Sequence, residues 1–376
     1  MVGYMKLSIP AASGVEASVK RELRALGYGD CPAIQGRLAL EGDWEDIARL
    51  NVRLRAGERV LLVLEQFSAP DFDALFEGVS AIPWEEYFTP HTQILMDGKC
   101  RESTLMAIKT TGGVIKKAIV ERLRRKLGVS ELDERGERAV VNFEIYRDNA
   151  TISLDTSGDG LHKRGYRVRT YEAPLRETTA AAMVESSFFH AGKPFADLFC
   201  GSGTIPIEAA LYMRRIAPGR YRDFDFTKWK CAPAGVLSRA REEAAAEEVR
   251  GELAPVFASD ISPQAIEIAQ FHAKRAGVGK DIRFAVQDMR RFSSAERYGV
   301  LISNPPYGER LRCDLFTLYK DFGKVYRSLP DWSCVFLSSY DGAERAFGGK
   351  VTKKRHIFNA KLTCSMYTYA GKRPVK

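Results

Sequence analysis

The sequence predicts an α/β fold, with a doubly wound and mostly parallel sheet in the second half of the chain and two smaller α+β units before it. After about residue 160, short apolar runs alternate with helical segments, which is typical of parallel strands covered by helices on both faces. Before that point, amphipathic helices alternate with strands. Residues 350–370 predict two strands joined at "FNA", so we expect an antiparallel hairpin at the end of the sheet.

The first α+β unit is predicted from a regular order of short elements. Apolar residues at helical spacing, such as Val15, Val19 and Leu23, indicate an amphipathic helix over 14–28. The remaining elements of this unit are strands at 5–9, 33–42 and 59–67 and a helix at 44–55. The second unit is predicted to hold a helix at 71–84, a strand at 91–100, a helix at 113–127 that "TGG" opens, and a hairpin over 138–158 that turns at "DNA".

The second half of the chain predicts a helix at 175–192 and then a run of strands that end in polar residues. These strand ends are "PFADLFC" followed by "GSGT", then "PVFASD", "IRFAVQD", "GVLISNPP" and "CVFLSSY". In a doubly wound sheet, ligands bind outside the carboxyl ends of the strands. We therefore expect the chemistry at this edge, and only binding in the first 160 residues, where the sequence has no acid/base constellation.

Composition favours a basic protein of the cytoplasm with a polyanionic partner. The net charge is +9 and the isoelectric point is near 9.1, and the basic residues are clustered, which favours RNA. Seven scattered cysteines and five separated histidines predict free thiols and no metal site. No signal peptide or membrane span is predicted. Charge runs are usually solvated faces, but the candidate RNA-binding residues are Lys116, Lys117, Arg124, Arg125, Lys163, Arg164 and Arg167.

The segment "DLFCGSGT" favours a nucleotide-like cofactor. Gly201 and Gly203 allow a tight turn and close backbone approach where a helix begins. A dinucleotide fingerprint needs a third glycine, but residue 206 is proline. S-Adenosylmethionine, which has no pyrophosphate, therefore fits better than NAD. The alternative is a plain glycine turn.

Two carboxylates and the "NPPY" segment follow the next strands. Asp260 can accept both ribose hydroxyls of a cofactor, and Asp288 can accept from an adenine amino group. A single Asp after a strand is usually a helix cap. Three such strand ends in order, followed by "NPPY" after the fourth, predict one binding crevice.

The order "DLFCGSGT", "SDIS", "QDM" and "NPPYGER" resembles class I S-adenosylmethionine-dependent amino-methyltransferases. The chain is most similar to the THUMP-domain RNA guanine-N2 methyltransferases of the bacterial large-subunit ribosomal RNA type, a UPF0020-like family, and "LNVRLRAGERVLL", "DTSGDGLHKRGYR", "APLRETTAAAM" and "RRIAPGRYRDFDFTKW" extend the resemblance over nearly the whole chain. It implies a ferredoxin-like domain at 1–67, a THUMP domain at 68–160 and a catalytic domain at 161–376. It also implies cofactor contacts at Thr178, Asp197, Phe199, Gly201, Gly203, Thr204, Asp260, Ile261, Asp288, Met289 and Asn304.

The "NPPY" residues explain how an exocyclic amine could react. The Asn304 side-chain oxygen and the Pro305 carbonyl can accept the two N–H donors of the amine, so that its nitrogen pyramidalises toward a methyl donor. Pro305 and Pro306 stiffen the loop, and Tyr307 can stack on a base taken out of its stem. Glu309 and Arg310 are given no catalytic role. The alternatives are an adenine-N6 methyltransferase, a transfer RNA guanine as substrate, and a non-catalytic RNA-binding assembly factor.

Overall fold

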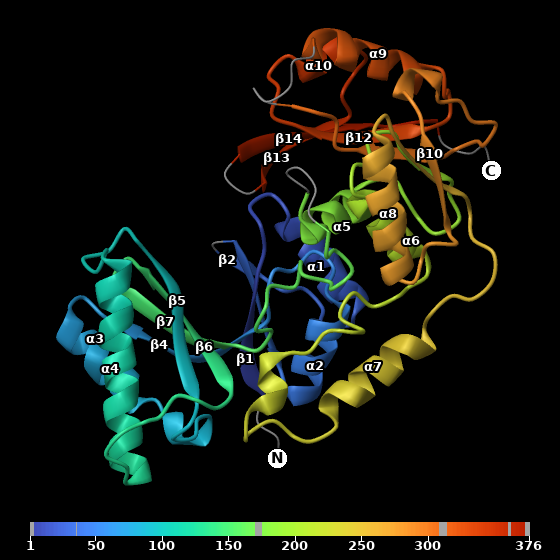
Figure 1. Cartoon of the computed structure of the whole chain (residues 1–376). Coiled ribbons are helices and arrows are strands. Elements are labelled where there is room, and N and C mark those ends of the chain that lie inside the picture. The colour runs from blue at the N-terminus through green and yellow to red at the C-terminus, as the bar shows by residue number, and fades with distance from the viewer. Residues whose placement is uncertain (1–3, 35, 170–174, 308–313, 360–361, 373–376) are drawn as a thin grey trace.

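The computed structural model describes residues 4–34, 36–169, 175–307, 314–359 and 362–372, and these form two seven-stranded sheets (Figure 1). The N-terminal sheet carries both of the predicted α+β units. The C-terminal sheet is the predicted doubly wound sheet with its closing hairpin. The expected α/β class is therefore confirmed.

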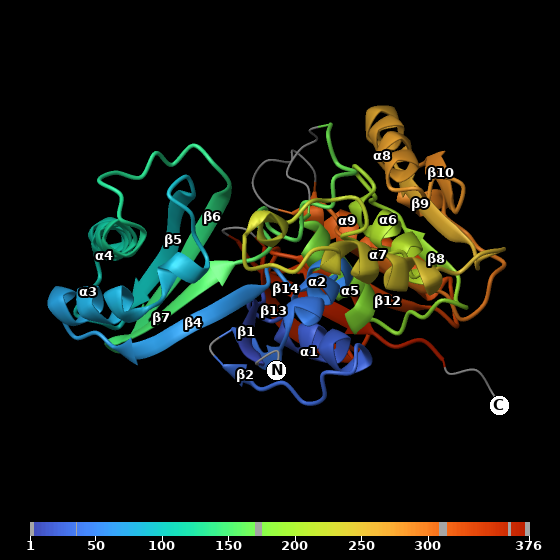
Figure 2. The same cartoon turned by 90° about the horizontal axis from the view of Figure 1, so that it is seen from below.

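The N-terminal sheet joins the two α+β units through one long strand. In spatial order its strands are β2 (Ala33–Ile34), β3 (Arg37–Gly42), β1 (Met5–Pro10), β4 (Leu61–Ser68), β7 (Asn149–Asp155), β6 (Arg138–Tyr146) and β5 (Gln93–Arg101). β4 pairs with β1 on one side and with β7 on the other, and only β5 and β6 pair in parallel. The half around β5 projects away from the rest of the molecule in Figures 1 and 2.

Helices cover this sheet in pairs. The helices are α1 (Glu16–Ala25), α2 (Trp44–Arg53), α3 (Phe72–Ala81), the short η1 (Trp84–Glu86) and α4 (Ile108–Leu127). The start of α4 at Ile108 corrects the expectation that "TGG" opens this helix at 113. Gly112 and Gly113 lie inside α4, and a Cβ on Gly112 would be in ordinary van der Waals contact with the Phe143 ring at 3.4 Å.

The C-terminal sheet is parallel except at its hairpin edge. Its spatial order is β10 (Ile282–Val286), β9 (Val256–Asp260), β8 (Phe195–Asp197), β11 (Val300–Ser303), β12 (Ser333–Ser338), β14 (Leu362–Tyr369) and β13 (Lys353–Asn359). Only β14 runs antiparallel to its two neighbours. Part of the link predicted at "FNA" lies outside the described residues.

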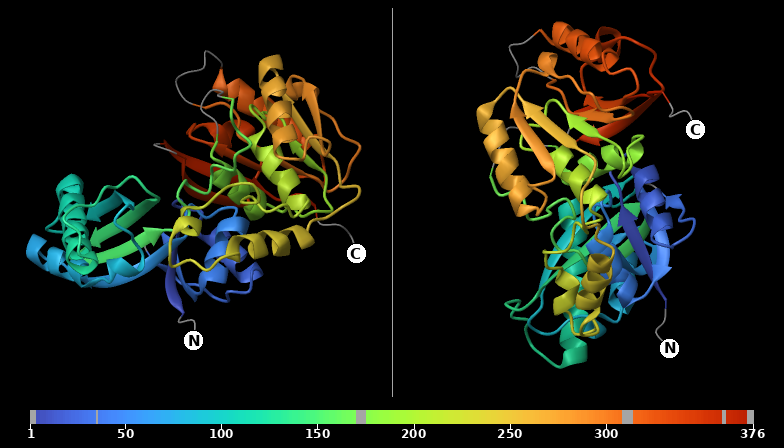
Figure 3. Two further views of the ribbon diagram at one scale, coloured as in Figure 1. Left: turned by 60° about the horizontal axis from the view of Figure 1, so that its bottom comes forward. Right: turned by 90° about the vertical axis from the view of Figure 1, so that its right-hand side faces the viewer.

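Each face of the C-terminal sheet has its own core, which explains the continuous apolar strands. On β12, Val335 and Leu337 face one core, and Cys334 and Phe336 face the other. The helices on the two faces are seen on opposite sides of the sheet in Figure 3. One face is covered by α5 (Glu177–Ser186), α6 (Thr204–Met213) and α8 (Pro263–Arg275), and the other by α9 (Leu315–Arg327) and α10 (Ala343–Phe347).

A long insertion between β8 and β9 binds the two halves of the molecule together. It contains the short η2 (Asp225–Lys228) and α7 (Val236–Ala246), and α7 packs on α2 of the N-terminal sheet. Three ion pairs link the two helices at a constant sequence offset of 194. They are Glu45–Arg239, Arg49–Glu243 and Arg53–Glu247.

The structure also describes the cysteines and the lengths of the helices. The six cysteines in the described part of the chain are free thiols, and Cys313 lies outside it. Within the described ranges, no helix is both long and apolar enough to cross a membrane.

Candidate active site

The "GSGT" loop joins β8 to α6 in the conformation that its glycines predict. Gly201 and Gly203 have φ values of 50° and 86°, a region that favours glycine. Gly203 is the N-cap of α6, and a Cβ on it would lie only 2.9 Å from the Cβ of Ala269 in α8. Thr204 is the buried first residue of α6. The loop is therefore fixed by close packing between α6 and α8.

Asp197 lies at the end of β8 and is linked by a hydrogen bond to β11. Its Oδ1 accepts hydrogen bonds from the Ser303 hydroxyl at 2.8 Å and from the Phe199 N–H at 3.1 Å. Its Oδ2 is buried and has no hydrogen-bond partner among the described residues. Burial raises the pKa of Asp197 to about 7. A cationic or hydroxyl donor of a ligand would therefore be stabilised here.

Asp260 supports the loop from the end of β9. Its carboxylate accepts from the Gly201 N–H at 2.9 Å and from the Ser262 N–H at 3.0 Å. The N-cap of α8 is Ser262, whose hydroxyl accepts from Ala265, so Asp260 is not the helix cap. The next side chain, Ile261, is 70% exposed and offers an apolar surface beside this carboxylate.

Asp288, after β10, has its oxygens engaged inside the protein. It caps the short η3 (Met289–Arg291), accepting from the Arg290 N–H, and its other oxygen pairs with the Arg290 guanidinium at 2.9 Å. Met289 is buried. A cofactor amino group would therefore share the Asp288 carboxylate with Arg290.

The "NPPY" segment follows β11 and leaves one acceptor unused. Asn304 Oδ1 is buried and has no hydrogen-bond partner in the described part of the chain. The Pro306 carbonyl accepts from the Tyr319 hydroxyl at 3.3 Å, and this hydroxyl also lies 2.7 Å from Ser338 Oγ. Pro305 is buried, and Tyr307 packs against the core. Gly308, Glu309 and Arg310 lie outside the described residues.

Two other predicted cofactor residues have protein partners. Thr178, at the start of α5, donates its hydroxyl to Glu58 Oε1 of the N-terminal region at 2.7 Å. Phe199 packs edge-on against Phe322 of α9, with ring centroids 5.2 Å apart. The first contact joins α5 to the N-terminal region, and the second joins the segment after β8 to α9.

The strand order explains how these residues meet. β9, β8 and β11 are adjacent, and the Gly201–Asp260 and Asp197–Ser303 bonds join their carboxyl ends. The glycine turn and the unpaired oxygen of Asp197 fit S-adenosylmethionine, which carries an ammonium group and two ribose hydroxyls. Ser303 was missed by the sequence analysis, although it precedes "NPPY" directly; Tyr319 and Ser338 have no sequence signal.

The candidate RNA-binding residues fall into different environments. Lys116 is bonded to Glu134 and to the Ile94 carbonyl, and Lys117 lies 3.8 Å from Glu121. Arg124 and Arg125 are exposed on α4 and make no ion pair with any described residue. These two arginines are the best placed of the α4 candidates to meet a phosphate.

The linker candidates lie at the junction of the domains. Lys163 is exposed and pairs with Asp159, and Arg167 pairs with Glu177. Arg164 is different, because its side chain is only 2% exposed and lies 3.5 Å from Glu208 of α6. Its guanidinium also donates to the carbonyls of Leu161 and Arg55. Arg164 therefore fits a structural role at the junction and does not fit a phosphate contact.

Comparison with known proteins shows the family to which the chain belongs. The family UPF0020, described as "RMKL-like, methyltransferase domain", matches residues 164–368, an RlmL ferredoxin-like domain matches 6–61, and a THUMP domain matches 69–155. A putative RNA methyltransferase, YpsC of Bacillus subtilis, is 39% identical over 96% of this chain and 95% of its own length. The ribosomal RNA large subunit methyltransferase K/L of Psychromonas ingrahamii is 34% identical over 97% of this chain, which spans about half, 50%, of that relative.

A solved structure agrees over the full chain. It is SMU.472, a putative methyltransferase complexed with SAH, which matches with a TM-score of 0.92 and 36% identity and covers 100% of both chains. The fold and site thus define an S-adenosylmethionine-dependent methyltransferase of class I. The chain belongs to the UPF0020 methyltransferase family and carries the family's ferredoxin-like and THUMP domains.

Proposed function

We propose that this methyltransferase acts in the cytoplasm on RNA and forms N2-methylguanosine in 23S ribosomal RNA. The observation that carries the proposal is Asn304 Oδ1, a buried acceptor without a partner in the described residues. Leaving a buried acceptor unsatisfied costs about 1–3 kcal/mol. The cost is recovered when a substrate N–H donor binds, so the atom is suited to an exocyclic amine.

The residues around Asn304 support a role in holding that amine. The Pro305 carbonyl is free of backbone hydrogen bonds from the described residues and can accept the second N–H. The neighbouring Pro306 carbonyl is held by Tyr319, so the loop is ordered before substrate binds. S-Adenosylmethionine supplies an electrophilic methyl group on a sulfonium. The methylated nitrogen is acidic and releases its proton without a strong base.

The cofactor is proposed to bind at the three adjacent strand ends. Asp260 would accept the ribose hydroxyls, Asp197 Oδ2 would accept a donor from the amino acid part, and Ile261 would pack against the adenine. The backbone of the "GSGT" loop would approach the cofactor at Gly201, Gly203 and Thr204. The remaining residues around the cofactor would be Thr178, Phe199, Asp288 and Met289.

The RNA assignment rests on the THUMP domain, on the basic residues and on the named relatives. YpsC and the K/L enzyme are named as RNA methyltransferases. Arg124 and Arg125, which lie on the THUMP domain, would contact phosphates of the RNA. Lys117, Lys163 and Arg167 would add to the basic surface. Lys116 would contribute its charge beside Glu134.

The test is to incubate the purified chain with S-adenosylmethionine and unmodified 23S ribosomal RNA and to analyse the nucleosides by mass spectrometry. N2-Methylguanosine is expected, and transfer RNA is the parallel substrate. N6-Methyladenosine would reject the guanine assignment, because "NPPY" can serve any planar amine. Equal methylation of transfer RNA would reject the assignment of ribosomal RNA as the substrate. RNA binding without any transfer would support a non-catalytic assembly factor.

A further inference from the structure

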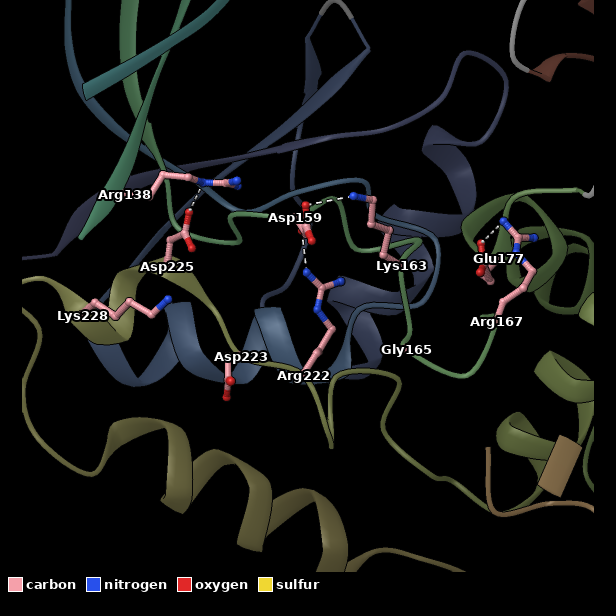
Figure 4. A pocket seen from close by; sticks show the side chains of 10 residues that line it. All are labelled: Arg138, Asp159, Lys163, Gly165, Arg167, Glu177, Arg222, Asp223, Asp225 and Lys228. Atoms are coloured by element: carbon pink, nitrogen blue, oxygen red, sulfur yellow. Dashed lines mark hydrogen bonds and ion pairs between the residues drawn. The ribbon is translucent and has the colours of Figure 1, made fainter. Parts of the chain in front are cut away.

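A polar cavity of about 700 Å³ lies where the THUMP domain, the linker and the insertion meet. Its lining comes from the start of β6, from residues 159–167, from α5 and from the insertion around η2 (Figure 4). Neither Asn304 nor Asp197 is among its lining residues. The lining residues are Arg138, Asp159, Lys163, Gly165, Arg167, Glu177, Arg222, Asp223, Asp225 and Lys228.

Arg222 is a buried cation without a carboxylate partner. It is 9% exposed, and its guanidinium donates to the carbonyls of Gly160 and Asp159. It makes no ion pair with any acid of the described chain. Burial, with the nearby Arg164, lowers the pKa of Arg222 to about 10, and Asp159 and Asp155 act in the opposite direction, so the charge persists at neutral pH. Because a buried charge is costly unless it is paired, an anion in the cavity would stabilise this residue.

Lys228 and Arg138 add donors that the protein does not use. Lys228 is exposed, its amine points toward the other lining residues, and it has no ion pair with a residue of the described ranges (Figure 4). Arg138 binds Asp225 only through Nε, at 3.0 Å, so its terminal amines remain available. The three cations come from two segments of the chain, the start of β6 and the insertion around η2.

The carboxylates of the cavity do not cancel this positive field. Asp225 and Asp159 each pair with one cation of the lining, Arg138 and Lys163 respectively. Asp223 is exposed and points away from the other side chains of the cavity (Figure 4). Glu177 pairs with Arg167, another cation of the lining, and burial raises the pKa of Glu177 to about 7. Arg222 and Lys228 therefore remain as uncompensated charges.

We propose that the junction cavity binds a phosphate of the RNA backbone, with Arg222, Lys228 and Arg138 as its donors. The ligand chemistry is a phosphate group, and a phosphodiester strand fits better than a free nucleotide because the cavity is shared by the RNA-binding domain and the catalytic domain. A strand held there would be fixed between its anchor on the THUMP domain and the reacting base. The proposal rests on the proposed RNA substrate, and none of these three residues was singled out in the sequence.

The experiment uses the full chain with Lys228→Ala and the matched control Lys350→Ala, an exposed lysine outside the cavity. RNA affinity is measured over a salt series with unmodified 23S ribosomal RNA fragments. Loss of one phosphate contact should make the slope of log affinity against log salt shallower by about 0.7, the value for single-stranded nucleic acid. Lys228→Glu should weaken binding further, and Lys350→Ala should match the wild type. S-Adenosylmethionine affinity should not change in any of them.

The other possible results separate the cavity proposal from the proposed function. If the wild-type chain binds and methylates RNA but Lys228→Ala has the same affinity and slope, the cavity proposal is wrong and the proposed function stands. If the wild-type chain does not bind RNA, both are wrong. Guanosine monophosphate, titrated by calorimetry, is the probe for a free nucleotide. Nucleotide binding that Lys228→Ala abolishes, with RNA affinity unchanged, would assign the cavity to a free nucleotide and overturn the proposal that it binds an RNA phosphate. Arg222→Met is a supporting variant, to be interpreted only with its unfolding temperature measured.

Discussion

Two buried side-chain oxygens at the edge of the C-terminal sheet and the buried Glu144 carboxylate of the N-terminal sheet are bonded in opposite ways. Asp197 Oδ2 and Asn304 Oδ1 are buried without a partner in the described residues. The buried carboxylate of Glu144 on β6 is instead bonded by three cations, two from the neighbouring strand β5 and one from β3. These cations are Arg37, Lys99 and Arg101.

This difference separates a site for a ligand from a site that stabilises the fold. An unsatisfied buried acceptor lowers the stability of the protein by about 1–3 kcal/mol, so it is retained where a ligand supplies the missing donor. A carboxylate whose oxygens are already bonded by protein donors does not need a ligand to supply one. Substitutions in the two regions should therefore have opposite effects on activity and on stability.

The largest effect is expected for Asn304→Ala. Removing one positioned acceptor should lower the rate of methyl transfer by about 10²–10³-fold, by analogy with the loss of an oxyanion-hole donor. The affinity for S-adenosylmethionine should stay within a few-fold, and the unfolding temperature should not fall, because an unsatisfied buried group is removed. Single-turnover kinetics and thermal unfolding measure these quantities. Asn142→Ala, on the N-terminal sheet, is the matched control, and near-normal turnover of Asn304→Ala would remove the role assigned to this atom.

Asp260→Ala should weaken cofactor binding. Hydrogen bonds to a charged group contribute roughly 1.5–3 kcal/mol each, and this carboxylate also holds the Gly201 N–H, so we expect the dissociation constant to rise by more than tenfold. Calorimetric titration with S-adenosylmethionine measures it. Asp71→Ala removes a helix cap of α3 and should reduce stability alone. If the two variants bound the cofactor equally well, Asp260 would have only a local structural role.

Glu144→Ala should lower the stability of the protein and leave its activity unchanged. Removing the shared partner of three cations should lower the free energy of unfolding by about 1–3 kcal/mol, less than for a fully buried pair because the cations are partly exposed. Methyl transfer by the folded protein should be unchanged. Denaturant unfolding and a transfer assay test both parts. A variant of normal stability and reduced activity would contradict the comparison.

The smallest effect is expected for Tyr319→Phe. The hydroxyl holds the Pro306 carbonyl and Ser338, and a typical hydrogen bond contributes about 0.5–1.5 kcal/mol. We expect methyl transfer to slow by a few-fold to about tenfold without a change in the cofactor dissociation constant. A weaker affinity for the cofactor, with an unchanged rate, would show that Tyr319 does not act through the "NPPY" loop.

The parts of the site that lie within one short segment could be predicted from the sequence. The structure of "GSGT" and "NPPY" depends on their own residues, through the conformations that glycine allows and the stiffness of proline. The order of the apolar strands predicts the sheet edge where the two segments meet. The doubly wound fold followed from the same alternation. Ser303, next to "NPPY", could have been predicted from its position alone.

Contacts between distant segments could not be predicted in this way. Arg164 and Lys163 are neighbours in one basic run, but the partner that buries Arg164, Glu208, is 44 residues away in α6. The bond between Thr178 and Glu58 spans 120 residues. The single sheet formed through β4 has the same origin, because strand pairing across a domain boundary leaves no mark on local periodicity.

The ladder of ion pairs between α2 and α7 has a consequence for how the chain can be divided. α7 belongs to the catalytic segment by sequence but packs on the N-terminal region, and the linker residues Thr156, Leu161 and Tyr166 are buried. The boundary near residue 160 therefore lies within a packed interface and is not a hinge. A fragment starting there would expose the apolar side of α7 and should be prone to aggregation and protease cleavage, whereas the intact chain should resist cleavage at this boundary.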